Sequence, residues 1–318
     1  SILALKKYSK NLECSIDLVN VFGEWDNSNL NHANIKIISF LKNKSILNAN
    51  KKGFLRSRFY TLIIIFISLF PLLRLIKKNN YDFVISHLIT SLPILLFSLI
   101  KTKTKLILSI SGFPKLTKLR TLFWKFSQKN IFKIICPSYE TKNLLLTNKI
   151  FRSDQLVVIK DPHIISKKFL NKKNSTLIDF PLKQEKFLIS IGRLTRQKNF
   201  LFLIEAFKNI LKIRNDLHLL IIGEGEDRKK IEKKIKDYEL THKVHLIGYQ
   251  DNIYKYLKNA FCYVSTSLWE GPDLSMLDAA YLNIPIICSN CKSGRKEFIS
   301  EGQRGYIFET NSMNAFFN

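Results

Sequence analysis

A cluster of basic residues follows a predicted strand at Lys186–Ile191 and precedes a predicted helix that begins at Asn199. Gly192 opens the cluster and lets another group approach the backbone closely, because glycine has no side chain. Arg193 and Lys198 then project from this strand-to-helix turn. Two cations together with the free amides of a helix start suit a diphosphate. We therefore predict a diphosphate-binding turn, with a solvated basic turn as the alternative.

A second cluster carries two carboxylates, Glu270 and Asp278, after the predicted strand at Phe261–Ser265. Glu270 lies in the loop and Asp278 near the start of the next predicted helix, so their oxygens can accept hydrogen bonds from the hydroxyls of a sugar and a ribose. The free N–H groups of Asp273 and Leu274 can bind a phosphate oxygen. Acidic residues are also common at helix starts because the helix dipole favours them. We favour the second half of a sugar-nucleotide site.

No Asp-x-Asp pair occurs in the sequence. Metal-dependent transferases use such a pair to hold a divalent ion on the diphosphate, so we expect no metal and no other cofactor. Cationic side chains would then supply the positive charge. Cys288 and Cys291 have the Cys-x-x-Cys spacing but lack the second pair that a zinc site needs. Two small buried residues are favoured over a redox pair, and five cysteines, an odd number, favour the reducing cytoplasm.

Predicted strands and helices alternate along the chain, which indicates parallel sheets with crossover helices. In the first half, strands are predicted at 15–22, 34–40, 81–86, 105–110, 131–137 and 155–159, and helices at 59–76, 88–100 and 116–129. In the second half, strands are predicted at 186–191, 217–222, 244–247, 261–265 and 285–288, and helices at 199–213, 227–238, 253–259 and 274–282. A polar linker near 164–184 separates two predicted domains, 1–163 and 164–318. We predict an α/β protein of two Rossmann-like doubly wound domains that face a cleft, where the carboxyl ends of the strands hold ligands.

The chain is strongly basic. Its 318 residues include 51 Lys and Arg against 25 Asp and Glu, a formal net charge of +26. Residues 51–150 are the extreme, with 18 basic side chains against 2 acidic ones. Such a field attracts polyanions, which include nucleic acids, anionic lipids and phosphorylated substrates. A solvated lysine surface is the alternative.

An apolar run at 59–76 has 18 residues and basic residues on both sides. A helix that spans a bilayer needs about 20 apolar residues. A buried crossover helix and a helix that lies in the membrane surface are therefore both favoured over a span. The positive charge around the run supports the membrane-surface interpretation.

The motifs GRLTRQKN, GEGE, HLIGY, WEGPDLSMLDAA, NIPIICSN, EFI and GYIF occur in this order. In this the chain resembles the retaining GT-B glycosyltransferases of family 4, the glycosyl transferases group 1. The resemblance covers Lys186–Phe308 and continues more weakly over 81–163. It implies a GT-B fold and retaining transfer of a hexose-type sugar from a nucleotide-diphosphate sugar, UDP-linked by the family's habit. The implied acceptor is a saccharide or a polyprenyl-linked saccharide, in surface polysaccharide or lipopolysaccharide synthesis.

The resemblance gives Arg193 and Lys198 the role of neutralising the donor diphosphate, and Glu270 that of contacting the transferred sugar. These three residues are the expected catalytic group. The resemblance further assigns the donor-binding residues Gly192, Gly271, Asp273, Leu274 and Asp278, and the acceptor-side residues His87, Ser111 and Gly112.

The sequence departs from the family pattern at three positions. Asp278 replaces the family's second glutamate, so it reaches less far towards the ribose. Pro272 has no N–H, which removes one amide from the phosphate-binding turn. Ser111 stands where the family often has histidine, and the sequence leaves open whether His87 replaces it. We also expect a fragment at both ends, since the family's first strand and C-terminal helix are not matched.

Two other functions remain open from the sequence. The charge suggests a basic nucleic-acid-binding protein, although no motif interleaves aromatic with basic residues, so we expect no nucleic-acid partner. Asp278, Ser111 and the unmatched ends suggest a sugar-nucleotide binder without turnover. We expect a cytoplasmic protein, with peripheral attachment to an anionic membrane surface on the inner face of the plasma membrane left open.

Overall fold

The computed structural model describes residues 14–20, 35–40, 54–87, 91–160, 182, 185–271, 273–292, 294–299 and 305–317. The chain divides into two compact units. The first comprises Ser1–Ser111, Leu116–Cys136 and Leu145–Ile164, and the second comprises Gly112–Lys115, Pro137–Leu144 and Ile165–Asn318. The domain boundary predicted between residues 163 and 164 lies outside the described residues.

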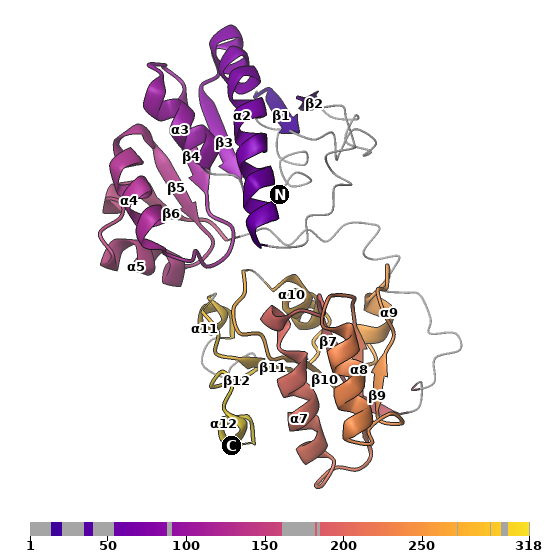
Figure 1. Ribbon diagram of the computed structural model, residues 1–318. Helices are drawn as coiled ribbons and strands as arrows, with labels where there is room; N and C mark the ends of the chain where they lie inside the picture. Colours follow the sequence, from indigo (N-terminus) through magenta and orange to yellow (C-terminus); the bar gives the residue numbers. More distant parts are fainter. Residues whose placement is uncertain are drawn as a thin grey trace. The chain divides into compact units, whose positions relative to one another are not determined.

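The second unit is built on a six-stranded parallel sheet in the order β12-β11-β10-β7-β8-β9 (Figure 1). Its strands are β7 (Lys186–Ile191), β8 (Leu217–Ile222), β9 (Val244–Leu246), β10 (Cys262–Ser265), β11 (Ile286–Ser289) and β12 (Tyr306–Phe308). The chain adds β8 and β9 on one side of β7, and then β10, β11 and β12 on the other. The strand order therefore reverses between β7 and β10, and in open α/β sheets ligands bind at such a switch point.

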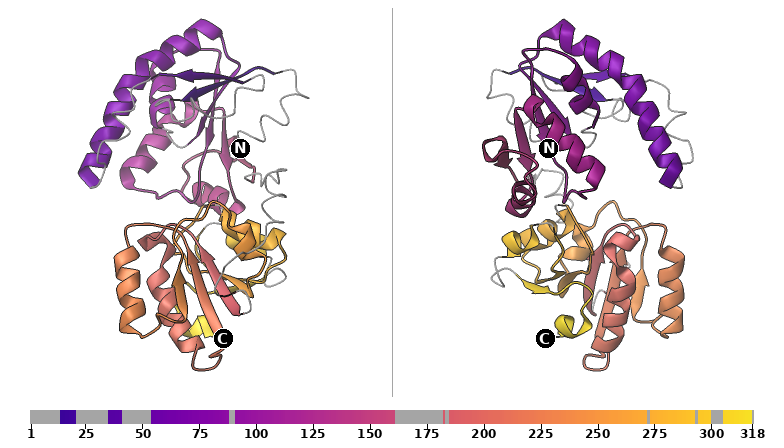
Figure 2. Two further views of the ribbon diagram at one scale, coloured as in Figure 1. Left: turned by 90° about the vertical axis from the view of Figure 1, so that its right-hand side faces the viewer. Right: turned by 60° about the vertical axis from the view of Figure 1, so that its left-hand side comes forward.

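Helices cover both faces of this sheet (Figure 2). Leu188 of β7 packs in a core with α7 (Phe200–Ile210) and α8 (Arg228–Asp237). Its neighbours Phe187 and Ile189 pack in a separate core with α9 (Tyr254–Leu257), α10 (Leu274–Tyr281) and α11 (Arg295–Ile299). Successive side chains of a strand point to opposite faces, so a continuous apolar strand can fill two cores. The second sheet is doubly wound, as predicted.

The first unit contains a four-stranded parallel sheet that follows chain order. Its strands are β3 (Phe83–His87), β4 (Lys105–Ser109), β5 (Lys133–Cys136) and β6 (Leu156–Val158). They share one core with α2 (Phe54–Asn79), α3 (Ser91–Leu99), α4 (Lys118–Ser127) and α5 (Tyr139–Thr147). A separate parallel pair is formed by β1 (Ile16–Asn20) and β2 (Ile35–Ser39). Within the described residues, this unit lacks the reversal of strand order seen in the second sheet.

Helix α2 contains the apolar run predicted at 59–76 and extends it to 26 residues. Ser68, Leu72 and Ile76 are buried against the core, whereas Phe66 and Phe70 are largely exposed. Among the residues that the structure describes, no helix combines the length and the apolar character needed to cross a bilayer. α2 is therefore a partly buried helix of the first unit.

Several short elements were not predicted from the sequence: α5, α11, β12 and α12 (Met313–Phe317). Each is short or polar, so its apolar residues do not repeat often enough to give a clear period. Leu145 of α5 and Ile299 of α11 are nonetheless fully buried. Tertiary packing, rather than local pattern, stabilises these elements.

Two histidines form a pair across neighbouring strands of the second sheet. Nδ1 of His218 on β8 and Nε2 of His245 on β9 are 3.1 Å apart, and the rings stack. Burial is the main cause that lowers the pKa of both rings. The positive charge of Lys243 and the neighbouring His242 lower both pKa values further, whereas the Glu185 carboxylate raises the pKa of His218.

We predict that this pair makes the fold less stable in mild acid. The folded-state pKa lies below the unfolded value of about 6.5, so as pH falls the unfolded chain takes up protons first and stability is lost. H218Q/H245Q should flatten the dependence of the unfolding free energy on pH between about 7 and 5, measured by denaturant titration. H87Q, a change of a histidine in the first unit, is the control. An unchanged slope in the double variant would contradict the prediction.

Candidate functional site

The two predicted clusters lie side by side at the carboxyl edge of the second sheet. β7 and β10 are hydrogen-bonded neighbours, with Tyr263 opposite Ile189. The turn after β7 forms the short 3-10 helix η4 (Arg196–Lys198), and the loop after β10 leads to α10. Because parallel strands end at the same edge, the chain brings both turns to the switch point.

An ion pair joins the two turns. Nζ of Lys198 lies 2.6 Å from Oε1 of Glu270, and both side chains are largely buried. The Ser267 hydroxyl donates to the same carboxylate oxygen at 2.6 Å, and Gln197 Nε2 donates to Oε2 at 3.2 Å. All these partners hold the Glu270 carboxylate in one orientation.

Backbone groups reinforce the connection. The amide of Leu268 donates to the carbonyl of Gln197 at 2.8 Å, and the Thr266 hydroxyl is 3.1 Å from the carbonyl of Lys198. Asn199 adopts the left-handed conformation between η4 and α7, with φ of 54°. Asparagine tolerates this conformation better than most residues do, so a local sequence choice allows the sharp turn.

Gly192 and Gly223 let this edge of the sheet pack closely. A Cβ on Gly192 would lie 2.7 Å from Cε of Lys198, so the lysine side chain passes over a position that only glycine leaves open. A Cβ on Gly223 would lie 1.9 Å from the carbonyl oxygen of Gly192, a backbone atom that cannot turn away. Gly192 thus has the role of close approach that the sequence predicted, and the approaching group is Lys198.

Arg193 follows Gly192 and is exposed. No described residue forms an ion pair with its guanidinium, in contrast to Lys198. The structure therefore brings Gly192, Lys198 and Glu270 into contact and leaves the Arg193 side chain in solvent beside them.

A second, deeper ion pair supports the loop that carries Glu270. Nη2 of Arg295 on α11 lies 2.7 Å from Oδ2 of Asp273 and 2.8 Å from the Ser265 hydroxyl, and Nη1 lies 3.1 Å from the Ser289 hydroxyl. Asp273 also accepts from the Met276 amide at 3.3 Å and so caps α10. Burial alone would raise the pKa of Asp273, but Lys198 and Arg295 lower it below its ordinary value.

The sequence analysis missed Arg295, Ser267 and Gln197. The polar residues Ser265, Ser267 and Ser289 within otherwise apolar strand ends were a usable signal, because buried polar groups need partners. Nothing in the sequence indicated that the partner would be Arg295, which lies 22 residues beyond Asp273.

The remaining donor-side residues lie around α10. Leu274 is exposed at the first position of the helix, and Gly271 precedes it in the loop. Asp278 is buried one turn further on and forms a hydrogen bond with Tyr254. Burial and this carboxylate raise the pKa of the Tyr254 hydroxyl to about 12. Pro272 lies outside the described residues.

Two predicted acceptor-side residues, His87 and Ser111, lie at the carboxyl ends of β3 and β4 in the first unit. The Ser111 hydroxyl is 3.3 Å from Nε2 of His87, and Nδ1 of His87 is 3.0 Å from the Ser109 hydroxyl. Gly112 follows with φ of 71°, a conformation that favours glycine. His87 and Ser111, 24 residues apart, are therefore direct neighbours.

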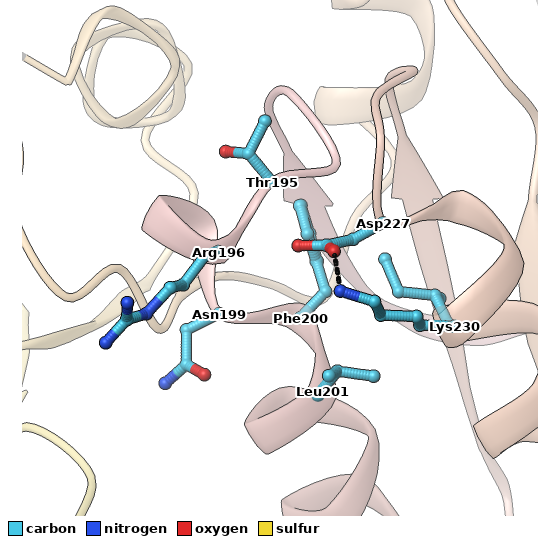
Figure 3. Close-up of a pocket in the computed structure, with 8 residues that line it drawn as sticks. Thr195, Arg196, Asn199, Phe200, Leu201, Asp227 and Lys230 are labelled. Carbon is cyan, nitrogen blue, oxygen red and sulfur yellow. Dashed lines mark hydrogen bonds and ion pairs between the residues drawn. The ribbon is translucent and has the colours of Figure 1, made fainter. Parts of the chain in front are cut away.

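A small hollow of about 140 Å³ lies between the start of α7 and that of α8 (Figure 3). Asp227 and Lys230 form an ion pair of 2.9 Å there, and the Arg196 side chain points away from this pair (Figure 3). None of Gly192, Lys198 and Glu270 lines it. Its volume is far below the ~300 Å³ at which small-molecule sites begin, so it is not a candidate for a nucleotide sugar.

No group of three or more potential metal-binding side chains occurs in the part of the chain that the structure describes. Cys288 and Cys291 are buried and unlinked. Burial raises the pKa of the Cys288 thiol to about 11, which keeps it protonated and unreactive at neutral pH. The interpretation as small buried residues fits these observations.

Residues 175–318 match the family described as Glycosyl transferases group 1. The matched part of the chain contains the site around Lys198 and Glu270. The resemblance inferred from the order of the motifs is confirmed.

Two curated relatives match over most of the chain. An uncharacterized glycosyltransferase of Methanocaldococcus jannaschii is 30% identical over 250 residues, 72% of this chain and 61% of the relative. The UDP-Gal:alpha-D-GlcNAc-diphosphoundecaprenol alpha-1,3-galactosyltransferase of Escherichia coli is 28% identical over 265 residues, 79% of this chain and 68% of the relative. The chain thus spans about six tenths of the length of the first relative.

The fold is also that of solved glycosyltransferases. A glycosyltransferase from Rickettsia africae superimposes with a TM-score of 0.72 at 19% identity, covering 99% of this chain and 81% of that one. The predicted α/β fold of the GT-B class is confirmed.

We predict that replacing one member of the Arg295–Asp273 pair lowers the unfolding free energy far more than replacing both members. R295M leaves a buried carboxylate without its cation and should cost about 3–5 kcal/mol of unfolding free energy. R295M/D273N removes both charges, keeps a cap for α10, and should recover much of the loss. Denaturant unfolding gives the unfolding free energy of the wild type and of both variants, with R214M at the exposed Arg214–Asp216 pair as the control. A double variant no better than R295M would contradict the prediction.

We also predict an unequal response of the two glycines. G223A forces a Cβ onto the backbone of Gly192 and requires alanine at φ of 144°, so it should destabilise by about 2 kcal/mol or more. G192A meets Cε, Cδ and Cγ of Lys198, which are side-chain atoms and can shift more easily than backbone, so it should cost clearly less. Thermal unfolding of the two variants side by side is the measurement. Equal losses would mean that Lys198 cannot move aside.

Proposed function

We propose that this chain is a retaining glycosyltransferase that moves a hexose-type sugar from a nucleotide-diphosphate sugar to a saccharide or lipid-linked saccharide acceptor. The observation that carries the proposal is the Lys198–Glu270 ion pair at the switch point of a sheet of this family. In this proposal the donor's diphosphate and sugar meet at this cation and carboxylate.

In this proposal Lys198 and Arg193 hold the diphosphate. An ammonium has three donors, so Lys198 can contact Glu270 and a phosphate oxygen together. Arg193, exposed beside it, supplies a second cation with a fork that fits two phosphate oxygens. Both stabilise the negative charge that grows on the diphosphate as it leaves.

Glu270 orients the transferred sugar, and Asp278 holds the ribose. The acceptor oxygen bonds to the anomeric carbon on the face from which the diphosphate departs. The carbon–oxygen bond to the phosphate breaks, and the acceptor's proton passes to the released phosphate oxygen. This proposal includes the catalytic roles. It also includes donor-binding roles for Gly192, Gly271, Asp273, Leu274 and Asp278, and acceptor-side roles for His87, Ser111 and Gly112.

The donor and acceptor classes rest on the relatives. The E. coli relative is named for a UDP-sugar donor and an undecaprenol-linked acceptor, and we extend both classes to this chain, in surface polysaccharide or lipopolysaccharide synthesis. Independence of a divalent metal is also proposed, with Arg193 and Lys198 in its place. A cytoplasmic location, peripheral on the inner face of the plasma membrane, stays a prediction.

We predict that R193A, K198A and E270Q each lower the transfer rate about a hundredfold or more, since each removes charge that acts on the reacting groups. Transfer is measured with a UDP-sugar and undecaprenyl-diphosphate-linked sugar, with and without a chelator. Calorimetry with UDP-, GDP- and ADP-sugars should show weaker UDP-sugar binding for R193A and K198A.

R196A and E224Q are matched controls. Arg196 lines the separate small hollow, and Glu224 pairs with Arg228 outside the two clusters. Normal rates for R193A and E270Q would refute the assignment of the site. Donor binding without turnover under any condition would favour a binder over an enzyme.

A further inference from the structure

The first unit carries a basic surface that the proposed transfer does not use. Between Asp82 and Glu140 the sequence contains nine Lys and Arg and no Asp or Glu. Many of these cations gather at the amino ends of β4 and β5, the edge opposite to His87 and Ser111.

An open cavity of about 590 Å³ lies at this edge. Some of its cations are engaged within the protein. Nζ of Lys105 lies 4.7 Å from the centre of the Phe132 ring, Lys133 donates to the carbonyl of Asp154 at 2.6 Å, and Arg152 pairs with the Asp154 carboxylate.

Three other lysines of the cavity are Lys101, Lys103 and Lys129. All three are exposed, and none forms an ion pair or hydrogen bond through its side chain with another described residue. Lysines that follow the ends of α3 and α4 are also favoured by the helix dipole. The dipole accounts for Lys101 and Lys129, but it gives no reason for apolar side chains next to them.

Large apolar side chains stand in solvent beside these lysines. On α4, Leu119, Leu122 and Phe126 are 79%, 67% and 73% exposed, and on α3 Leu99 is 69% exposed. Residues three, four and seven apart lie on one side of a helix. Leu119, Leu122 and Phe126 therefore form a stripe along α4, while Trp124 anchors the helix in the core.

The stripe and the lysines are continuous. Phe126 is three residues from Lys129, which belongs to the 3-10 helix η2 (Gln128–Asn130) at the end of α4. Asn130 Nδ2 donates to the Ser98 hydroxyl at 3.1 Å and so ties η2 to the last turn of α3, next to Leu99.

We propose that Leu99, Leu119, Leu122 and Phe126, together with Lys101, Lys103 and Lys129, form a docking face for an anionic phospholipid bilayer. The apolar side chains enter the boundary between headgroups and acyl chains, and the lysines contact the phosphates. Charge favours an anionic membrane over a second copy of this chain as the partner. Two copies of this basic face would repel each other, whereas an anionic membrane attracts the face. The docking goes beyond the proposed transfer and does not depend on it.

This face differs from the segment predicted from the sequence. α2 also exposes Phe66 and Phe70, but its cations lie towards its two ends, with Arg56 and Arg58 near the start and Arg74, Lys77 and Lys78 near the end. On α4 and at the adjoining edge, cations and apolar side chains share the same turns.

The test is flotation of the full chain with vesicles of phosphatidylcholine that contain phosphatidylglycerol, or with phosphatidylcholine alone. We expect binding to the anionic vesicles and little to the neutral ones. K101Q/K103Q/K129Q should weaken binding about a hundredfold. Each lysine near an anionic surface contributes roughly 1 kcal/mol, and about 1.4 kcal/mol corresponds to a tenfold change in affinity. L119S/L122S/F126S should weaken it at least about tenfold, and high salt should weaken wild-type binding.

Matched controls change lysines and exposed large apolar residues elsewhere. K212Q/K229Q/K236Q and I213S/Y306S alter exposed residues of the second unit and should leave flotation unchanged. F66S/F70S tests α2. Circular dichroism and thermal unfolding confirm that each variant is folded.

Four results would overturn the docking face. They are equal binding to both vesicle types, failure to bind either, flotation lost in F66S/F70S but retained in the α4 variant, and lysine-dependent binding of duplex DNA without vesicle binding. A change in oligomeric state in L119S/L122S/F126S, with flotation unchanged, would instead assign the stripe to contact between copies. Calorimetry of UDP-sugars in the same samples separates a failure of docking from a failure of the proposed transfer.

Discussion

The ion pair between Lys198 and Glu270 joins the two turns on which the proposed chemistry depends. The two residues lie 72 positions apart and meet because β7 and β10 are neighbours at the centre of a parallel sheet. Burial keeps solvent from weakening their attraction. Gly192 makes room for the lysine side chain, and Ser267 and Gln197 fix the carboxylate. The fold therefore delivers a preorganised pair rather than two mobile side chains.

A second ion pair, between Arg295 and Asp273, supports the loop that carries Glu270. Arg295 and Asp273 are both buried, and two buried charges are tolerated only when each has its partner and further hydrogen bonds. Ser265, Ser289 and the amide of Met276 provide those bonds. The result fixes the start of α10 and the loop that presents Glu270. Polar side chains thus lie together at the carboxyl edge of a largely apolar sheet.

The two units use positive charge differently. In the second unit Lys198 and Arg295 are paired with carboxylates at the carboxyl edge of the sheet. In the first unit they are numerous, exposed and mixed with apolar side chains. Net charge alone could not separate nucleic acid, lipid and phosphorylated substrates as partners, because all three are anionic. The position of Leu119, Leu122 and Phe126 beside Lys129 favours a lipid surface.

The sequence by itself determined the alternating strands and helices, with β7 and β8 predicted at their observed bounds, and the two clusters that follow β7 and β10. These features are local, since an apolar strand, a glycine turn and a helix start are each written within about ten residues. It did not determine that Arg295 meets Asp273, that His87 meets Ser111, or that Lys198 rather than Arg193 reaches Glu270. Only the tertiary structure decided these contacts, because they join segments that are distant in the chain and depend on which strands become neighbours. It also decided which side of α4 remains in solvent, since burial depends on the elements packed against a helix and not on its own sequence.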